Sequence, residues 1–509
     1  MKKILYIIGA VMLAGVIAGC TSNFEDYNRN PKQPTSIPTA NLLQNTLQSI
    51  AFQDQNQAQR MYTFWGAYSG QFTAVQNWSF GNEIWAYYNP STAHRNTPMS
   101  ILFGLIYPNF FFIEERTNQE GAVYGVALVL KVYAMHMLAS AQGPIPYTKV
   151  ENGQIEAPYD DEATAWAAMF EDLDRAINIL SGSGTTNADL SSVDCIYNGN
   201  ITQWLKFANT LKLRMAMRVS SVAPYAQQKA EEAVASGVMT DTSDSAWVDN
   251  EKLGLRNPWS ISWLGQVGNG SVEARPNACI VSWMNGYNDP RRPKYFTQTS
   301  TGAYLGALSG PSTPPVPANY SHTSHIFYES EFAAQPVIYA AEAAFLRAEG
   351  ALKGWNMGGT AENFYHEGIR LSLREYGVES AYNSYIATTS APAAHNDTTR
   401  PLDNTSATTN ISVRWESTPD RQLEQILTQK WIALYQDPMN GWADYRRTGY
   451  PKLWKATSSS NPDVTTTRGA RRTPFPQTEY ENNRANVEAA AALVGGDSMG
   501  YDLWWAQQN

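Results

Sequence analysis

The chain has 509 residues, of which 43% are hydrophobic and 16% are charged, and its formal net charge is −9. This composition is typical of a globular protein and excludes wholesale disorder, while the acidic balance argues against a protein that wraps nucleic acid. Three cysteines are too few for a disulfide-dense scaffold or a multi-cysteine metal module. The 16 tryptophans are about double ordinary usage, so we expect some indole rings to serve more than the core.

The N-terminus has the features of a bacterial lipoprotein signal. Lys2 and Lys3 precede an apolar run over residues 4–17, and the chain then reads Ile-Ala-Gly up to Cys20. A short apolar run with small residues before the cut is typical of a secretory signal, and the cysteine after Ala-Gly resembles a lipobox. We therefore predict a signal peptide at 1–19 and lipid attachment at Cys20, with one mature domain over 20–509. An ordinary signal peptide with a chance cysteine is the alternative.

Amphipathic periodicity and helix start and stop signals predict four helix pairs in the mature chain. In the predicted helix that begins at 201, one apolar face contains Ile201, Trp204 and Leu211. In the pair 337–376, Gly354 is a typical residue to end the first helix and Thr360 a typical residue to cap the second. The predicted pairs occupy 122–181, 201–236, 337–376 and 420–448. Two such helices cannot bury both apolar faces alone, so we expect a mostly α fold in which the pairs stack. Long irregular insertions are expected at 61–97, 240–335 and 378–416.

The most apolar segment of the mature chain, residues 122–141, raises the question of a membrane span. Lys131 lies at its centre and His136 follows. A central lysine costs about 3 kcal/mol in a bilayer, so we expect a buried helix of a globular body.

The first insertion is rich in aromatic rings and nearly free of charge. Between Met61 and His94 the only charged residue is Glu83, and amides and hydroxyls fill the spaces between the rings. Flat rings beside amide donors and acceptors suit sugars, whose faces present C–H groups and whose edges present hydroxyls. Core packing is the alternative for any single ring. The candidate ligand-binding residues of this tract are Trp78, Asn82, Glu83, Trp85, Tyr87 and Tyr88.

A second aromatic set begins at Pro258 and ends at Phe296. Trp259 and Trp263 precede a loop rich in glycine and serine, residues 265–271, so we count both as further candidate ligand-binding residues. The other rings of this set have no such neighbour.

Enzyme signatures are mostly absent from the sequence. No phosphate-binding loop, dinucleotide fingerprint or zinc-protease motif occurs, so we expect no catalytic residues, no metal ligands and no cofactor. A structural calcium ion is left open. Cys195 and Cys279 either form a disulfide or remain as two buried thiols, and the sequence does not distinguish these states.

Several motifs in chain order resemble the SusD/RagB family of outer-membrane nutrient-binding lipoproteins. They are Asn30-Pro31 with Pro34-Thr35, Gly143-Pro144-Ile145-Pro146-Tyr147, Asp289-Pro290-Arg291, Ala341-Glu342-Ala343 and Gly441-Trp442-Ala443-Asp444-Tyr445-Arg446. The resemblance implies tetratricopeptide-like units, which agrees with the predicted pairs. It also implies a TonB-dependent transporter of the SusC type as partner, with the lipoprotein as its lid. Glu25 and Asp26 resemble a surface-export signal, which implies that the lipid-anchored protein faces the cell exterior.

The favoured hypothesis is a lid that captures an oligosaccharide for import without chemical change. Three alternatives remain: a lid of the same architecture that takes peptides, a surface glycosidase on an α-helical scaffold, and a structural adhesin. A glycosidase needs two carboxylates at the scissile bond, and Glu83 is the only acid within the aromatic tract.

Overall fold

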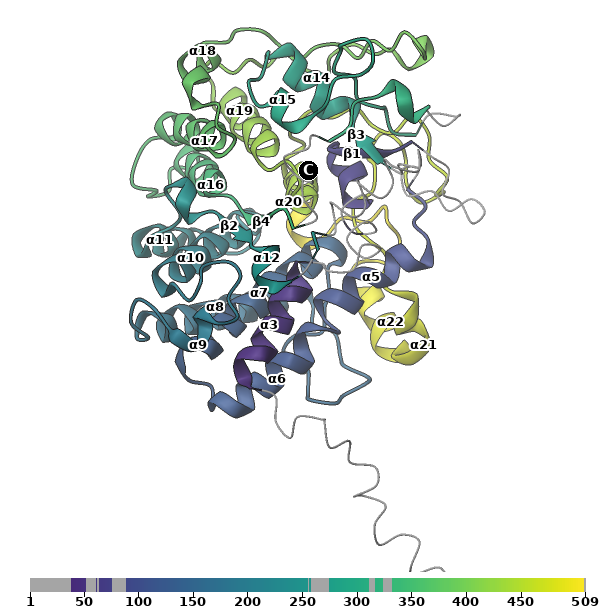
Figure 1. Ribbon diagram of the computed structural model, residues 1–509. Coiled ribbons are helices and arrows are strands. Elements are labelled where there is room, and N and C mark those ends of the chain that lie inside the picture. Colours follow the sequence, from purple (N-terminus) through teal and green to yellow (C-terminus); the bar gives the residue numbers. More distant parts are fainter. Residues whose placement is uncertain are drawn as a thin grey trace, which may run out of the picture.

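The protein is described here by a computed structural model. The described residues are 38–51, 61, 64–75, 88–254, 256–257, 274–310, 316–323 and 332–507. The fold is mostly α-helical, as predicted, and Figure 1 shows helices stacked along one side of the molecule, with the two-stranded sheet of β1 and β3 on the other side.

Three of the predicted helix pairs form helical hairpins. They are α7 (Gly121–Gln142) with α8 (Glu162–Ser181), α10 (Ile201–Arg218) with α11 (Ala226–Ser236), and α16 (Ala340–Leu352) with α17 (Ala361–Glu375). Successive hairpins touch through α8 and α10 and then through α10 and α16. The structure confirms the predicted cap and stop residues. The Thr360 side chain accepts a hydrogen bond from the Asn363 backbone N–H at the start of α17, and Gly354 takes a positive φ of 83° after the end of α16.

The fourth pair is helical as predicted but does not pack like the others. α19 (Pro419–Ala433) lies against α16 and α17, whereas α20 (Pro438–Thr448) packs mainly against α7 and the short helix η7 (Trp504–Ala506). The guanidinium of Arg446 lies 3.6 Å from the centre of the Trp442 ring and 4.9 Å from that of Trp505. These contacts hold α20 on the C-terminal segment, so the helix joins the last part of the chain to the first hairpin.

The apolar helix α7 is the centre of the fold. It is the one helix in the described ranges that is long and apolar enough to cross a membrane, and 94% of its most apolar window is buried inside the protein. Lys131 is paired with Asp172 at 2.7 Å, and its ammonium group lies 4.6 Å from the ring centres of Phe110 and Tyr147. A partner carboxylate and two aromatic faces replace water around this charge, which is why a core helix accepts it.

The third predicted pair starts later than expected. Residues 337 and 338 belong to strand β4 (Gln335–Ile338), which pairs antiparallel with β2 (Ala246–Val248), and α16 begins at Ala340. Proline and two β-branched residues favour an extended chain here. The hydroxyl of Ser245 accepts the backbone N–H of Ala340 at 3.0 Å, which stabilises the first turn of the helix.

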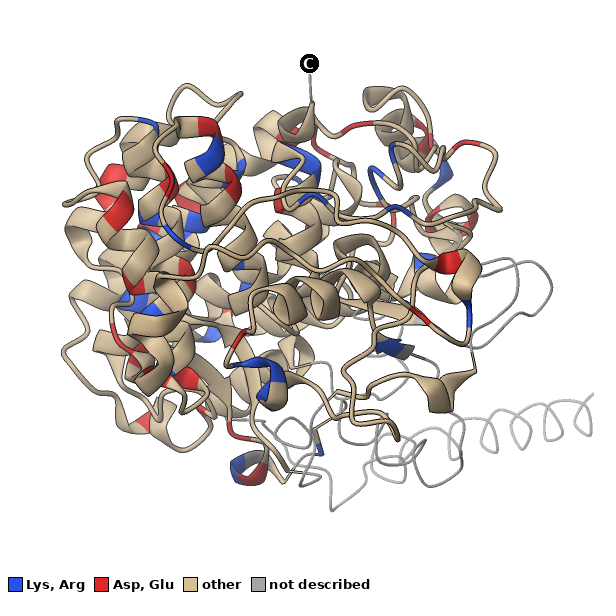
Figure 2. Cartoon of the chain, turned by 90° about the horizontal axis from the view of Figure 1, so that it is seen from above, with Lys and Arg blue, Asp and Glu red and all other residues tan. Residues whose placement is uncertain are grey.

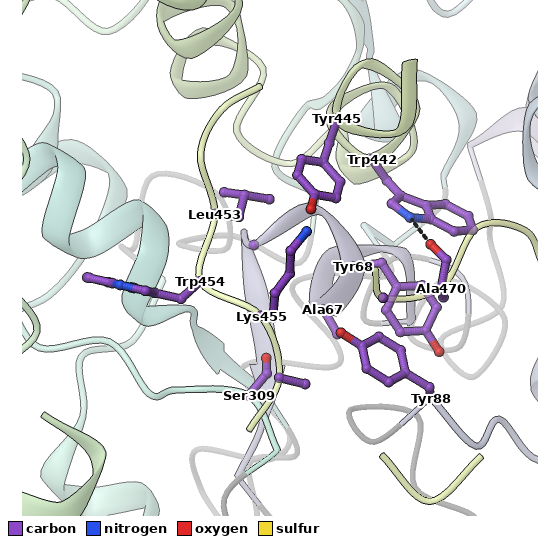
Figure 3. A pocket seen from close by; sticks show the side chains of 13 residues that line it. Ala67, Tyr68, Tyr88, Ser309, Trp442, Tyr445, Leu453, Trp454, Lys455 and Ala470 are labelled. Atoms are coloured by element: carbon purple, nitrogen blue, oxygen red, sulfur yellow. Dashed lines mark hydrogen bonds between the residues drawn. The ribbon is translucent and has the colours of Figure 1, made fainter. Parts of the chain in front are cut away.

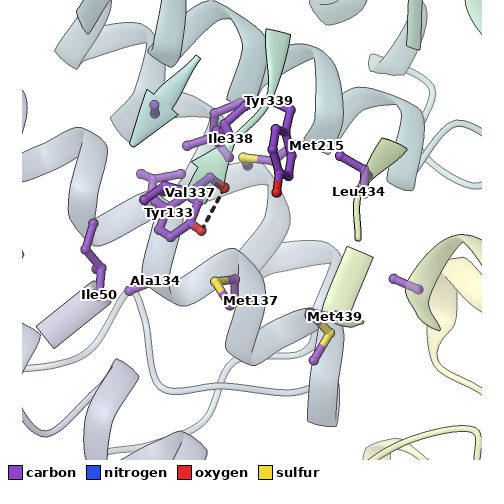
Figure 4. Close-up of a cluster of buried hydrophobic side chains, with 14 of the residues drawn as sticks. Ile50, Tyr133, Ala134, Met137, Met215, Val337, Ile338, Tyr339, Leu434 and Met439 are labelled. Atoms are coloured by element: carbon purple, nitrogen blue, oxygen red, sulfur yellow. Dashed lines mark hydrogen bonds between the residues drawn. The ribbon is translucent and has the colours of Figure 1, made fainter. Parts of the chain in front are cut away.

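The remaining helices complete the core around α7. α3 (Thr39–Ile50), α5 (Thr92–Leu102) and α6 (Ile106–Thr117) all contact α7. Figure 4 shows Ile50, Tyr133, Met215 and Leu434 converging from distant parts of the chain on one apolar centre. The other helices are α9 (Ala188–Ser191), α12 (Asn250–Leu253), α14 (Ala278–Gly286), α15 (Arg292–Tyr295), α18 (Tyr382–Ile386), α21 (Gln477–Asn482) and α22 (Arg484–Leu493).

Buried ion pairs connect the stacked helices. Arg214 of α10 donates through Nε to Glu342 of α16 at 2.8 Å, and both side chains are at most 1% exposed. Lys430 of α19 lies 2.8 Å from Asp444 of α20. Because each pair joins two different helices, together they link α10 with α16 and α19 with α20.

Much of the high tryptophan content serves the core. Among the tryptophans of the described ranges, seven are fully buried: Trp65, Trp166, Trp204, Trp283, Trp431, Trp442 and Trp505. The expectation that indole rings serve more than the core therefore rests on fewer rings than the composition indicates.

Candidate ligand-binding site

A small antiparallel sheet brings the two aromatic tracts together. Strand β1 (Phe72–Ala74) lies in the first tract and strand β3 (Ala274–Pro276) in the second, and Phe72 pairs with Pro276 while Ala74 pairs with Ala274. The chain therefore leaves β1 and enters β3 at the same end of one sheet. Strands from two tracts 200 residues apart in sequence, both predicted to bind ligand, are therefore paired directly.

A third segment is attached to the same sheet. Asn277, just after β3, forms a parallel bridge with Ala307, and its amide donates to the Ser309 hydroxyl at 2.9 Å. That hydroxyl in turn donates to Thr73 Oγ1 at 2.8 Å. These buried hydrogen bonds connect three distant segments, so we call β1, β3 and residues 305–310 the loop platform. The three segments are therefore held together at this base.

Most of the predicted site residues lie outside the described ranges, and their role stays a prediction. These are Trp78, Asn82, Glu83, Trp85 and Tyr87 of the first tract, Trp259 and Trp263 of the second, and Cys20 of the predicted lipid anchor. Of the predicted ligand-binding residues, the structure places Tyr88 alone.

Tyr88 anchors the end of the first tract in the protein body. It has a positive φ of 63°, its ring is 6% exposed, and it stacks on Tyr68 with ring centres 5.3 Å apart (Figure 3). Burial raises the pKa of its hydroxyl to about 12. The neighbouring cavity, lined also by Trp442 and Lys455, measures about 20 Å³, room for a single water molecule. In this position the ring offers almost no surface to a sugar.

Lys455 is the basic group in that small cavity. Its ammonium lies 4.1 Å from the centre of the Tyr445 ring, and burial together with the positive charge of Arg471 lowers its pKa to about 8. A water-sized cavity with this lining leaves no room for a sugar.

Charge and metal-binding groups do not gather into a site in the described part of the chain. Figure 2 shows acidic and basic residues intermixed over the helical stack. Within the described ranges, no group of three or more histidine, cysteine, aspartate or glutamate residues could hold a metal ion. Cys195 and Cys279 are free, buried thiols rather than a disulfide, which decides the alternative that the sequence left open.

Comparison with known families identifies the architecture. Residues 24–506 match the SusD-like family model, described as Susd and RagB outer membrane lipoprotein. The chain belongs to the SusD/RagB family. This confirms the family that the sequence motifs resemble, and with it the class of the protein: a nutrient-binding lipoprotein of the outer membrane.

Solved structures of SusD/RagB proteins are similar over nearly the whole chain. A SusD-like protein from Bacteroides thetaiotaomicron is 50% identical, with a TM-score of 0.87, and the match covers 93% of this chain and 99% of that one. A chitin-binding SusD homologue from Flavobacterium johnsoniae is 31% identical, with a TM-score of 0.85 and coverage of 92% and 99%. A homologue from Bacteroides ovatus is 36% identical, with a TM-score of 0.82 and the same coverage. No curated protein sequence matches significantly.

Beside the loop platform, the structure contains a larger hollow that the sequence did not predict. Its volume is about 350 Å³, and it is lined by α14 and by parts of the segments 299–306, 319 and 394–399. We call it the polar pocket. It escaped prediction because the polar part of its lining is serine, threonine and asparagine, mostly from loops, and these residue types are equally common in ordinary surface turns. The abundance of hydroxyl and amide groups in 378–416 was its one sequence signal.

Proposed function

We propose that this SusD/RagB protein captures an oligosaccharide at the cell surface, as the lid of a SusC-like TonB-dependent transporter, and passes it on unaltered. The observation that carries the proposal is the loop platform, in which strands from two ring-rich tracts pair with each other on a protein of a nutrient-binding family. The chitin-binding homologue from Flavobacterium johnsoniae supports a glycan as the ligand.

The physical chemistry of the two tracts favours a neutral sugar. Trp78 and Trp85 lie in a stretch whose only charged residue is Glu83. Stacking on indole rings takes up the C–H faces of a pyranose, and the amide groups between the rings exchange hydrogen bonds with its hydroxyls. Neither interaction requires a net charge on the ligand, so ionic strength should have little effect on binding.

A calorimetric titration tests the ligand assignment. A panel of defined neutral oligosaccharides, chitohexaose included, is titrated into the mature protein and into the variants Trp78→Ala and Trp85→Ala. Each stacked ring contributes about 1–3 kcal/mol, so we expect the affinity to fall roughly 5- to 150-fold in each variant. Trp355→Ala, in the connection between α16 and α17, is the matched control and should bind like the wild type.

Three results of the same experiment would redirect the proposal. Equal affinity in all variants for a verified ligand would remove the ring assignment. Binding of proteolytic peptides with no response to any glycan would favour the peptide-binding alternative. Shortening of the oligosaccharide during incubation, lost in Glu83→Gln, would establish a glycosidase. A lid predicts an intact ligand on mass spectrometry.

The partner is tested by isolation from the native outer membrane. A lid should co-purify in mild detergent with a large barrel protein of the TonB-dependent class, and the complex should survive removal of the oligosaccharide. Recovery of the lipoprotein alone, under conditions that preserve other outer-membrane complexes, would contradict the partnership.

A further inference from the structure

We propose that the polar pocket is a second sugar-binding site, which takes one neutral pyranose unit. The inference rests on the proposed function in one respect, because the unit would belong to the oligosaccharide whose other units bind at the aromatic tracts. The pocket's volume of about 350 Å³ falls within the range of small-molecule sites.

The lining of the pocket is polar and carries no formal charge. None of its lining residues is an aspartate, glutamate, lysine or arginine, and the one histidine, His395, is 2% exposed. Burial lowers the pKa of His395, so its ring is neutral at physiological pH. A phosphate or a carboxylate would find no cation among these residues, and a metal ion would find no carboxylate. A ligand with many hydroxyls and no charge fits this lining.

Several lining groups have hydrogen-bonding capacity to spare. Within the described ranges, the side chains of Ser282, Asn319, Asn396 and Thr398 make no hydrogen bond, and the buried Nε2 atom of His395 has no partner. They come from three places in the chain and line one hollow. Hydroxyl and amide groups that converge in this way match the hydroxyl-bearing edge of a pyranose.

One wall of the pocket is fixed by a buried carboxylate. Asp397 is fully buried and accepts hydrogen bonds from the Tyr320 hydroxyl at 2.6 Å and from the Thr399 backbone N–H at 2.8 Å. These bonds hold the segment 394–399 in place and tie it to the segment that contains Asn319. The backbone that carries these lining residues is therefore positioned before any ligand arrives, which lowers the entropic cost of binding.

A second part of the lining is fixed by contacts among α14, α15 and the 299–306 loop. Asn285 donates to the Tyr304 carbonyl at 2.9 Å and accepts from Arg292 at 3.0 Å. The Arg292 guanidinium lies 4.7 Å from the centre of the Tyr304 ring. The half-buried ring of Tyr304 is thereby held at the pocket and gives the site one aromatic surface.

The polar pocket adjoins the loop platform. Gly306 lines the pocket and packs so tightly on β3 that an added Cβ atom would lie 2.5 Å from the Asn277 carbonyl oxygen. Three residues of extended chain, about 10 Å, separate Asn277 from Ala274, where the second aromatic tract joins the sheet. The polar pocket therefore lies within a few sugar units of the point where the second aromatic tract joins the sheet.

Crystal soaks and saturation-transfer NMR test the inference independently of import. The probes are the methyl pyranosides of glucose, mannose, galactose and N-acetylglucosamine. We expect at least one of them to occupy the pocket in soaked crystals and to give saturation-transfer signals in solution. In the double variant Asn319→Ala/Asn396→Ala the affinity should fall about tenfold. Asn178→Ala, an exposed amide on α8, is the control and should bind like the wild type.

The possible outcomes separate this inference from the proposed function. Loss of pyranoside binding in the double variant, with retention in Trp78→Ala/Trp85→Ala, supports a distinct second site. No occupancy in any soak, unchanged signals in the double variant, or binding at crystal concentration only would each overturn the inference. Failure of wild-type protein to bind any oligosaccharide would instead overturn the proposed function, and the pyranoside result would still decide the pocket.

Discussion

The buried ion pair between Arg214 and Glu342 offers a quantitative test of the helical stack that carries the site. Glu342 is 0% exposed and accepts from Arg214 Nε at 2.8 Å, and Lys430 lies 3.8 Å from the same carboxylate. Glu342→Gln keeps the shape and removes the charge. It leaves Arg214 buried with only Asp437, at 3.8 Å, as a carboxylate neighbour. Breaking a buried pair in this way costs about 3–5 kcal/mol.

The loss converts into a measurable thermal shift. The entropy of unfolding is proportional to chain length and is about 1 kcal/mol per kelvin for a protein of this size. Because the shift in melting temperature equals the lost free energy divided by this entropy, the melting temperature should fall by about 3–5 °C. The matched control is Glu488→Gln. Glu488 pairs with Arg484 at 3.1 Å on the surface, where the two side chains are 57% and 66% exposed, and this change should cost less than about 1 kcal/mol.

Circular dichroism melts and urea titrations of the wild type and both variants make the comparison. A third variant, Arg214→Met/Glu342→Leu, should recover most of the lost stability, because apolar side chains of similar volume replace a buried pair at little cost. Equal stability of Glu342→Gln and Glu488→Gln would refute the reasoning, since it would mean that the buried carboxylate contributes no more than an exposed one.

Three further predictions concern titration, thiols and the anchor. Burial raises the pKa of Glu162 to about 7, so the stability that its protonated form provides is complete below about pH 4.5 and is lost as the pH rises through 7. Glu162→Gln should remove this pH dependence. In denaturant titrations from pH 4.5 to 8, the free energy of unfolding of the variant should rise by about 3 kcal/mol relative to that of the wild type. Parallel pH profiles of the two proteins would contradict this assignment to Glu162. Burial raises the pKa values of Cys195 and Cys279 to about 12, so a thiol reagent should label both only after unfolding, and rapid labelling of the native protein would contradict their burial. Cys20→Ala should abolish incorporation of labelled fatty acid in cells and release the protein from membranes, whereas retained label would place the lipid elsewhere.

The helices were predictable because their signals are local. Periodic apolar stripes and capping residues such as Thr360 act within a few residues, and the structure confirms the predicted helices to within a few positions. The partner of a helix is not a local property. α20 packs on η7 through the contact of Arg446 with Trp505, about 60 residues further along the chain, and no spacing rule anticipates that contact.

The candidate site was predictable only in part, for the same reason. The aromatic tracts are visible in composition, but whether a ring faces the core or the ligand depends on tertiary packing: Trp65 and Trp283 are fully buried. The pairing of β1 with β3 joins segments 200 residues apart through three residue pairs, too short a match to detect in sequence. The polar pocket is built from loop residues whose chemistry resembles that of any exposed turn.

Hydrogen exchange with and without bound oligosaccharide tests the central claim most directly. If the two aromatic tracts on the loop platform hold the ligand, peptides covering residues 71–90 and 256–280 should exchange more slowly when the sugar is present. Peptides from α8, α11 and α17 should exchange at unchanged rates. Protection confined to those helices, or no protection at a saturating concentration of a verified ligand, would contradict the account.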